Sequence, residues 1–174
     1  MEKTHLRIGR VFVQSVMKNG STQYMIYEDG LIEYKSNFID QGKNEYKPIN
    51  KLYVLKNCIV LPPEDIVLDA DENKVWIEIF KFWKANVLID EDSLAVLTAF
   101  TYLSWFYDCM ESVPYLLILG DLGTAKTRIL EIAGMLCFNA TSLGTAVTSA
   151  NIFRLQDIAK GTLMIDEFER NQTD

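Results

Sequence analysis

The sequence is poor in the residues that build metal sites and disulfide frameworks. Its 174 residues include one histidine and three cysteines, Cys58, Cys109 and Cys137, which form no CxxC pair. A zinc site needs several closely spaced cysteine or histidine ligands, so none is expected. Three widely separated thiols instead predict reduced cysteines and a cytoplasmic protein.

The sequence predicts neither a signal peptide nor a membrane-spanning segment. The N-terminus, Met1 to His5, has no apolar h-region. The longest apolar stretch, residues 94–110, is interrupted by four polar residues and is short for a bilayer span. It therefore predicts a buried helix, and no membrane partner is expected.

Basic residues are in the minority, 17 against 24 acidic ones, and the formal net charge is −7. This balance argues against a molecule that binds nucleic acid through its overall charge. The charge is unevenly spread, because residues 1–60 hold nine basic and six acidic side chains, whereas residues 61–113 hold three and eleven. Any contact with nucleic acid is therefore expected in the first segment, although its net of +3 is small.

Residues 1–62 are predicted to form a small β-rich module. Short apolar runs flank the dipeptides Asn19-Gly20 and Asp29-Gly30, which are typical of hairpin turns. A loop is expected over residues 40–50 and a further strand over residues 53–61. The two prolines that follow would end that strand, because proline cannot donate to a ladder.

Residues 63–112 are predicted to be a helical segment that leads into the next domain. Large apolar residues recur at helical spacing over residues 74–89, and a second helix is expected over residues 93–110 with Ser93 as its N-cap. The aromatic residues of the second helix could stack on bases, but packing in the core is the simpler expectation.

Residues 113–174 are predicted to form a parallel α/β core of the P-loop NTPase type. An apolar run of strand length at 115–119 precedes a Gly-containing loop. Helices and strands then alternate, as in a parallel sheet with crossover helices. The expected elements are a helix at 126–137, a strand or loop at 141–148, a helix at 150–159 capped by Ser149, and a strand at 162–165.

The loop between the first strand and helix resembles a phosphate-binding motif. It reads Gly120-Asp121-Leu122-Gly123-Thr124-Ala125-Lys126-Thr127, close to G-x-x-x-x-G-K-[ST]. Glycines allow successive N–H groups to face phosphate oxygens, and the helix N-terminus adds its positive end. Lys126 is expected to reach the β- and γ-phosphates of ATP, and Thr127 to coordinate Mg²⁺. The predicted nucleotide-binding residues run from 120 to 128 and end at Arg128, for which a helix-surface salt bridge is also expected.

Ala125 occupies a position where this motif usually has glycine. The substitution costs little if the chain there already enters a right-handed helix, which alanine favours. The alternative is an ordinary strand-to-helix turn with an exposed lysine.

A second motif lies about forty residues further along. The apolar residues Leu163 to Ile165 are followed by Asp166 and Glu167. Carboxylates at the end of a parallel strand lie where ligands bind. Asp166 is predicted to hold Mg²⁺, and Glu167 to polarise the attacking water, with Lys126 as the second catalytic residue. A pair of solvated acids is the simpler alternative.

Both motifs resemble those of the minichromosome maintenance (MCM) replicative helicases, which belong to the AAA+ ATPases. The stretch GDLGTAKTR is similar to their phosphate loop, which also has alanine before the lysine, and GTLMIDEFER is similar to their Walker B strand. The short gap between the motifs also resembles the ATPase domains of primase–helicases from mobile elements. The resemblance covers residues 98–170 and implies ATP and Mg²⁺ as cofactors, hexameric rings, and DNA as a partner.

The resemblance also implies elements that would follow Walker B. Hydrolysis in these ATPases needs a sensor residue and an arginine finger, which the sequence up to Asp174 does not provide, so the ATPase core is expected to be incomplete at its C-terminus. Two functions remain open: an ATP-hydrolysing subunit of a helicase or replication machine, or a nucleotide-dependent switch or assembly module without efficient turnover. A degraded ATPase retained as an interaction domain is a third.

Overall fold

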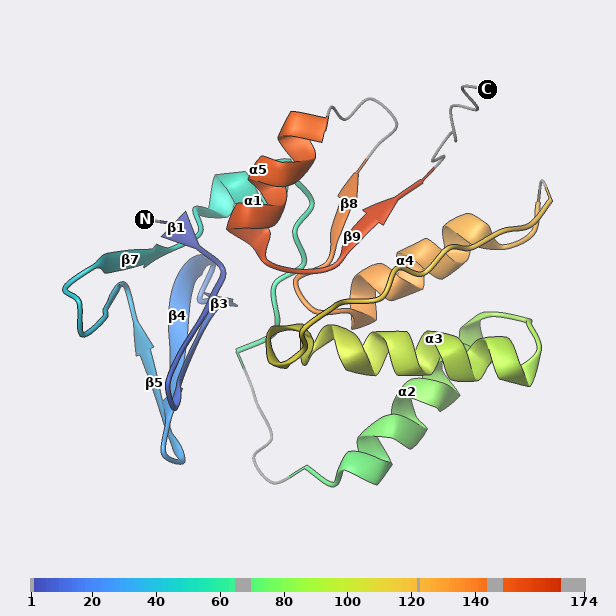
Figure 1. Cartoon of the computed structure of the whole chain (residues 1–174), viewed down its shortest axis with the longest axis horizontal. Coiled ribbons are helices and arrows are strands. Elements are labelled where there is room, and N and C mark those ends of the chain that lie inside the picture. Colours follow the sequence, from blue (N-terminus) through green and yellow to red (C-terminus); the bar gives the residue numbers. More distant parts are fainter. Residues whose placement is uncertain (1, 65–69, 122, 144–148, 167–174) are drawn as a thin grey trace.

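The computed structural model describes residues 2–64, 70–121, 123–143 and 149–166. An antiparallel sheet occupies one side of the molecule, and helices α2 to α4 occupy the other (Figure 1). Helices α1 and α5 and two short parallel strands lie between them at the top of this view.

The antiparallel sheet is a meander built by the predicted hairpins. It has the order β2-β3-β4-β5, which run over His5–Ile8, Val11–Lys18, Ser21–Glu28 and Leu31–Lys35. Asn19 and Gly20 have φ values of 48° and 75°, and Asp29 and Gly30 have 47° and 87°. Positive φ at both central residues is the geometry of a type I′ hairpin turn, so both turn predictions are confirmed.

A second, smaller sheet covers one face of the meander. It joins β1 (Glu2–Lys3), β7 (Glu45–Pro48) and β6 (Phe38–Ile39). The buried Tyr24 hydroxyl donates to the carbonyls of Lys3 at 2.9 Å and Lys47 at 2.7 Å, which ties β4 to both β1 and β7. The loop predicted for residues 40–50 therefore contains a strand, because β7 pairs with β1, which is distant in sequence.

The strand predicted over residues 53–61 is wrong, because helix α1 spans Lys51–Lys56. The Asn50 side chain caps this helix by accepting a hydrogen bond from the Leu52 N–H. Val54 is buried in a core cluster, and so local capping and tertiary packing outweigh β-propensity here. That cluster contains residues from both sides of position 62, namely Ile49, Val54, Ile59, Leu143, Leu155 and Ala159.

The next two helices form an antiparallel hairpin. Helix α2 spans Glu72–Asn86 and helix α3 spans Glu91–Ser104, and a 3₁₀ turn follows at Tyr107–Cys109. Asp90 is the N-cap of α3, and the predicted cap, Ser93, donates its hydroxyl to the Asp90 carboxylate at 2.6 Å. Trp83 is 1% exposed and its indole N–H donates to the Thr101 hydroxyl at 3.1 Å, which locks the two helices together.

The C-terminal part contains several of the predicted elements. Helix α4 (Lys126–Leu136), strand β8 (Thr141–Leu143), helix α5 (Ser149–Ala159) and strand β9 (Leu163–Ile165) follow in the expected order. Strands β8 and β9 pair in parallel. Within α5, Leu155 is buried, but Phe153, which was expected on the buried side, is 73% exposed.

The predicted fold class is wrong, because no parallel central sheet forms in the described residues. Most strand pairs are antiparallel, and the parallel β8–β9 pair is only three residues long. Residues 115–119, expected as the first core strand, belong to no sheet among the described residues. Leu116 and Ile118 pack on the helical core, but Tyr115, Leu117 and Leu119 are 102%, 69% and 81% exposed. A parallel strand is normally covered on both faces, and this segment is covered on one.

None of the helices in the described ranges has the length and hydropathy to cross a lipid bilayer.

Asn139 joins the antiparallel sheet to the C-terminal part. It is 1% exposed, its side-chain oxygen accepts from Gln14 Nε2 at 3.0 Å, and its Nδ2 donates to the Ala159 carbonyl at 3.1 Å. Gly161 packs so closely against Asn139 that a Cβ on Gly161 would lie 2.8 Å from the Asn139 carbonyl carbon and closer still to its oxygen. The fold therefore depends on glycine at position 161.

We predict that Gly161→Ala lowers the free energy of unfolding by about 3 kcal/mol, because its methyl group forces the Asn139 backbone to move. Urea denaturation followed by circular dichroism measures this change. Gly42→Ala is the matched control, since a Cβ there meets side-chain atoms of Asp40 and Asn44 at 3.3 Å or more and no backbone atom within 4 Å among those nearest to it. Equal effects of the two substitutions would contradict this account of the junction.

His5 lies in an aromatic cluster at the same junction. It is 6% exposed, and its ring centroid is 4.8 Å from that of Phe12 and 5.5 Å from that of Phe138. Its Nε2 lies 3.3 Å from Asp108 Oδ2, and Arg7 Nε lies 2.9 Å from the same oxygen. Burial lowers the pKa of His5 below its ordinary value, and this effect outweighs the opposing attraction of Asp108.

We predict that stability falls as the pH drops below about 6.5, the ordinary histidine pKa, because the unfolded chain protonates His5 before the folded chain does. The contribution of neutral His5 to stability is complete above about pH 6.5. It declines as the pH falls toward the lowered pKa of His5 in the folded chain. His5→Phe should flatten the plot of unfolding free energy between pH 7.5 and 5. An unchanged slope in this variant would assign the pH dependence to other groups.

Candidate nucleotide-binding site

The predicted phosphate loop connects the extended segment 115–119 to helix α4. Its described residues are solvent-exposed, except for the half-buried Lys126. In Figure 1, the loop lies at the far right, and the end of β9 points toward the same upper right side. The loop and the end of β9 thus lie on the same side of this view.

The loop contains two residues in the left-handed conformation. Gly123 has φ 82°, which suits glycine, and Ala125 has φ 41° and ψ 11°. The condition under which alanine would cost little at this position, entry into the right-handed region, is therefore not met. A Cβ on Gly120 would overlap the Thr124 hydroxyl, which itself donates to the Asp121 carbonyl at 2.6 Å. Gly120 is thus needed for the tight turn.

Lys126 folds back over this loop. Its ammonium group donates to the carbonyls of Gly120 at 2.5 Å and Asp121 at 2.7 Å. These contacts hold a positive charge above the turn, next to the first residues of α4. A lysine in this place can exchange its carbonyl partners for the oxygens of an anion, since ammonium hydrogen-bonds to phosphate more strongly than to neutral carbonyls.

The start of α4 adds further donors. Its first backbone bond within the helix runs from the Ile129 N–H to the Ala125 carbonyl at 2.9 Å. The N–H groups of the preceding first-turn residues have no acceptor within the helix, and the helix dipole places partial positive charge there. No side chain caps this end. The exposed Thr127 hydroxyl lies in the same turn.

Arg128 behaves as a helix-surface residue, as expected. Its Nη1 lies 3.2 Å from Glu131 Oε2, and its Nη2 donates to the Asn86 side-chain oxygen at 3.4 Å. The second contact links the start of α4 to the end of α2. No sequence pattern pointed to Asn86, because it lies 42 residues away and carries no motif.

The carboxylate motif is described only in part. Asp166 directly follows β9 and is half-buried. Glu167, the predicted water-polarising residue, lies outside the described residues, as does Leu122 of the loop. No group of three or more metal-ligating side chains occurs in the ranges that the structure describes. A magnesium ion held by Thr127, Asp166 and phosphate oxygens would not require such a group.

Comparison of the chain with protein-family models, with curated proteins and with solved structures gives no match.

We predict that Ala125→Gly raises the free energy of unfolding by about 0.5–1 kcal/mol. Glycine relieves roughly 1–2 kcal/mol of left-handed strain but loses about 0.5–1 kcal/mol more chain entropy on folding. Ala95→Gly is the control, because Ala95 is exposed within α3 and glycine there should cost about 1 kcal/mol. Thermal denaturation of both variants tests the opposite signs, and destabilisation by both would contradict the strained conformation of Ala125.

Proposed function

We propose that this chain binds ATP with Mg²⁺ through residues 120–128. The observation that carries the proposal is the position of Lys126, whose ammonium lies over a glycine-containing turn at the uncapped start of an eleven-residue helix. The fixed turn, the lysine and the first-turn N–H groups together form a donor set suited to a polyphosphate. The proposal depends on this loop and helix and does not require a central parallel sheet.

Each residue has a defined part in the proposed site. Lys126 binds the β- and γ-phosphate oxygens, and Gly120 and Gly123 let the backbone approach them. Thr127 and Asp166 hold Mg²⁺, which bound in this way neutralises phosphate charge. Glu167 polarises the water that attacks the γ-phosphate.

The cellular role proposed is that of a subunit in a DNA helicase or another replication or mobile-element machine. The support is the similarity of GDLGTAKTR and GTLMIDEFER to the motifs of MCM helicases. A ring-shaped homo-oligomer and a DNA partner belong to the same proposal. The exposed free thiols of Cys58 and Cys109 fit a reducing compartment such as the cytoplasm.

We predict that Lys126→Ala weakens ATP binding at least a hundredfold, because the loop loses the ammonium group that binds the β- and γ-phosphates. Isothermal titration with Mg·ATP measures the affinity. Lys74→Ala, which removes an exposed lysine on α2, is the control and should bind as the parent does. Unchanged ATP affinity in Lys126→Ala would rule out this site.

Turnover is tested separately from binding. Glu167→Gln should keep ATP affinity within about twofold and abolish phosphate release, because the amide is a much weaker base than the carboxylate. If the parent chain binds ATP but releases no phosphate with or without single-stranded DNA, the chain acts as a nucleotide-dependent switch rather than a motor.

A further inference from the structure

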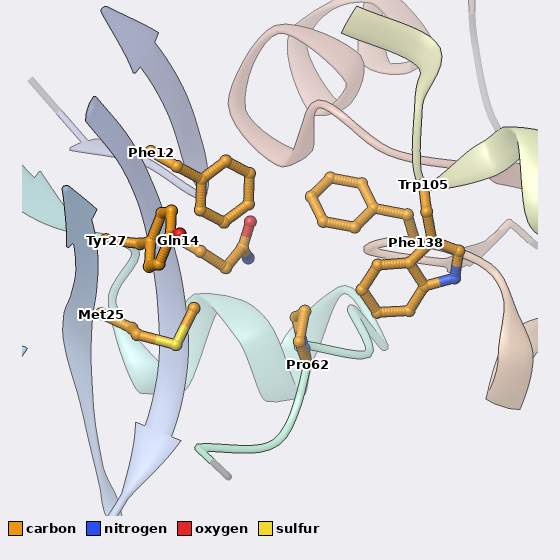
Figure 2. Close-up of a pocket in the computed structure, with 7 residues that line it drawn as sticks. All are labelled: Phe12, Gln14, Met25, Tyr27, Pro62, Trp105 and Phe138. Atoms are coloured by element: carbon orange, nitrogen blue, oxygen red, sulfur yellow. The ribbon is translucent and has the colours of Figure 1, made fainter. Parts of the chain in front are cut away.

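A second concave site lies away from the phosphate loop, between the antiparallel sheet and the segments that follow α3 and α4. It is a cavity of about 270 Å³ lined by Phe12, Gln14, Met25, Tyr27, Pro62, Trp105 and Phe138. Figure 2 shows aromatic rings on two opposite sides, with Phe12 and Tyr27 projecting from the strands toward Trp105 and Phe138. The cavity is open to solvent and is lined largely by flat apolar groups.

The strand register builds one wall of this cavity. Phe12 pairs with Tyr27, and Gln14 pairs with Met25, so these four side chains share one face of the β3–β4 ladder. The opposite wall is fixed by ring contacts, since the Trp105 and Phe138 centroids are 5.2 Å apart. His5 packs against both walls through Phe12 and Phe138. The walls are therefore held by the fold itself.

Gln14 places a buried hydrogen-bond acceptor behind the apolar lining of the cavity. It is 1% exposed, and among the described residues its Oε1 has no hydrogen-bond partner. Figure 2 shows the amide between the Phe12 and Phe138 sides. A buried acceptor without a partner is costly, and such groups in native proteins call for a specific explanation.

The surrounding hydrogen bonds determine which atom of this amide is unpartnered. Asn139 Nδ2 must face the Ala159 carbonyl, so Asn139 Oδ1 faces Gln14. Gln14 therefore directs Nε2 to Asn139 and to the Ser15 carbonyl at 2.9 Å, and Oε1 is left over. An N–H or O–H donor that reached this atom past the apolar lining would satisfy it.

A basic groove adjoins the cavity. It shares Phe12 and Tyr27 with the cavity and contains Arg7 and Arg10. Arg7 is held in place by Asp108 at 2.9 Å, with its guanidinium 5.9 Å from the centre of the Phe12 ring. Arg10 is 87% exposed and lies 3.8 Å from Asp29, which is 68% exposed, and a pair this solvated does not hold Arg10 strongly. Arg10 can therefore turn to an anion.

We propose that this composite site binds a nucleotide unit. The base enters the aromatic cavity and stacks on its walls, an amino group of the base donates to Gln14 Oε1, and the phosphate lies in the groove at Arg7 and Arg10. Aromatic side chains bind bases by stacking, and a carboxamide oxygen accepts from the exocyclic amino group of adenine or cytosine. Residues 1–60, which carry a net charge of +3, contribute most of the site.

A free nucleotide and a nucleotide within a single strand present the same chemistry to this site. The site is independent of the ATP-binding loop, so its test uses the full chain carrying Lys126→Ala. The probes are AMP, single-stranded (dA)12, and an abasic 12-mer with the same number of phosphates. Trp105 reports binding directly, because stacking on or beside it quenches its fluorescence, and a Trp105→Leu chain gives the signal of the other two tryptophans.

The expected result is quenching of Trp105 by (dA)12 and AMP and none by the abasic 12-mer. Equal affinity for AMP and (dA)12 identifies a free nucleotide as the source, whereas tighter, salt-sensitive binding of (dA)12 identifies a strand. Binding of the abasic 12-mer within twofold of (dA)12 would overturn the proposal, because it would show phosphate contacts without a base site. Absence of quenching by all three probes would overturn it as well.

Variants of the lining residues test the two halves of the site. Tyr27→Leu, at a half-buried position, should weaken (dA)12 binding roughly 5- to 100-fold through lost stacking. Gln14→Leu should also weaken (dA)12 binding. If this variant fails to fold because it loses the Asn139 contact, Tyr27→Leu still tests the proposal. Arg10→Ser should lower the affinity and the salt dependence, whereas the exposed Arg154→Ser on α5 should change neither. Full affinity in Tyr27→Leu would overturn the proposal.

Discussion

Asn139 accepts a hydrogen bond from β3 and donates one to the end of α5, and both bonds are buried. Backbone bonds flank Asn139 along the chain, from the Thr162 N–H to the Phe138 carbonyl at 3.0 Å and from the Thr141 N–H to the Thr162 carbonyl at 2.8 Å. Buried amides are costly unless their hydrogen bonds are satisfied, so this connection fixes one arrangement of the sheet, α4 and the β8–β9 pair. The left-handed φ of 42° at Asn139, tolerated better by asparagine than by most residues, allows the chain to turn there.

Both candidate sites depend on this connection, in different ways. For the aromatic cavity the dependence is direct, because Phe138 precedes Asn139 and Gln14 hydrogen-bonds to it. For the proposed phosphate loop, the dependence acts through α4. Gly134 of α4 packs so closely against β9 that a Cβ on Gly134 would lie 3.0 Å from the Met164 Cε. The position of α4 sets where Lys126 and Asp166 can lie relative to each other.

The sequence predicted local features of the fold better than distant pairings. The hairpin turns at Asn19-Gly20 and Asp29-Gly30 are encoded by two residues each, and α4 and α5 by their own apolar periodicity. By contrast, α1 was mistaken for a strand, since its six residues are too few to fix a period, and capping by Asn50 and burial of Val54 decide for the helix. Strand β7 depends on pairing with β1, more than forty residues away, which no local pattern reveals.

The same distinction holds for the sites. The contiguous phosphate loop could be found from its spacing, but the left-handed conformation of Ala125 could not, because alanine usually favours the right-handed region. The lining of the aromatic cavity is spread from Phe12 to Phe138. A single clue was present in the sequence: Gln14 is a polar residue amid the apolar positions of β3, and only the strand register shows that it faces the cavity.

The alternating exposure of residues 115–119 affects how the chain behaves in solution. Tyr115, Leu117 and Leu119 form an apolar row on an extended backbone that carries no charged side chain. Extended, uncharged, apolar segments of this length add readily to similar segments of other molecules. Association would then depend on the protein concentration rather than on the temperature, because it can begin from folded molecules without any prior unfolding.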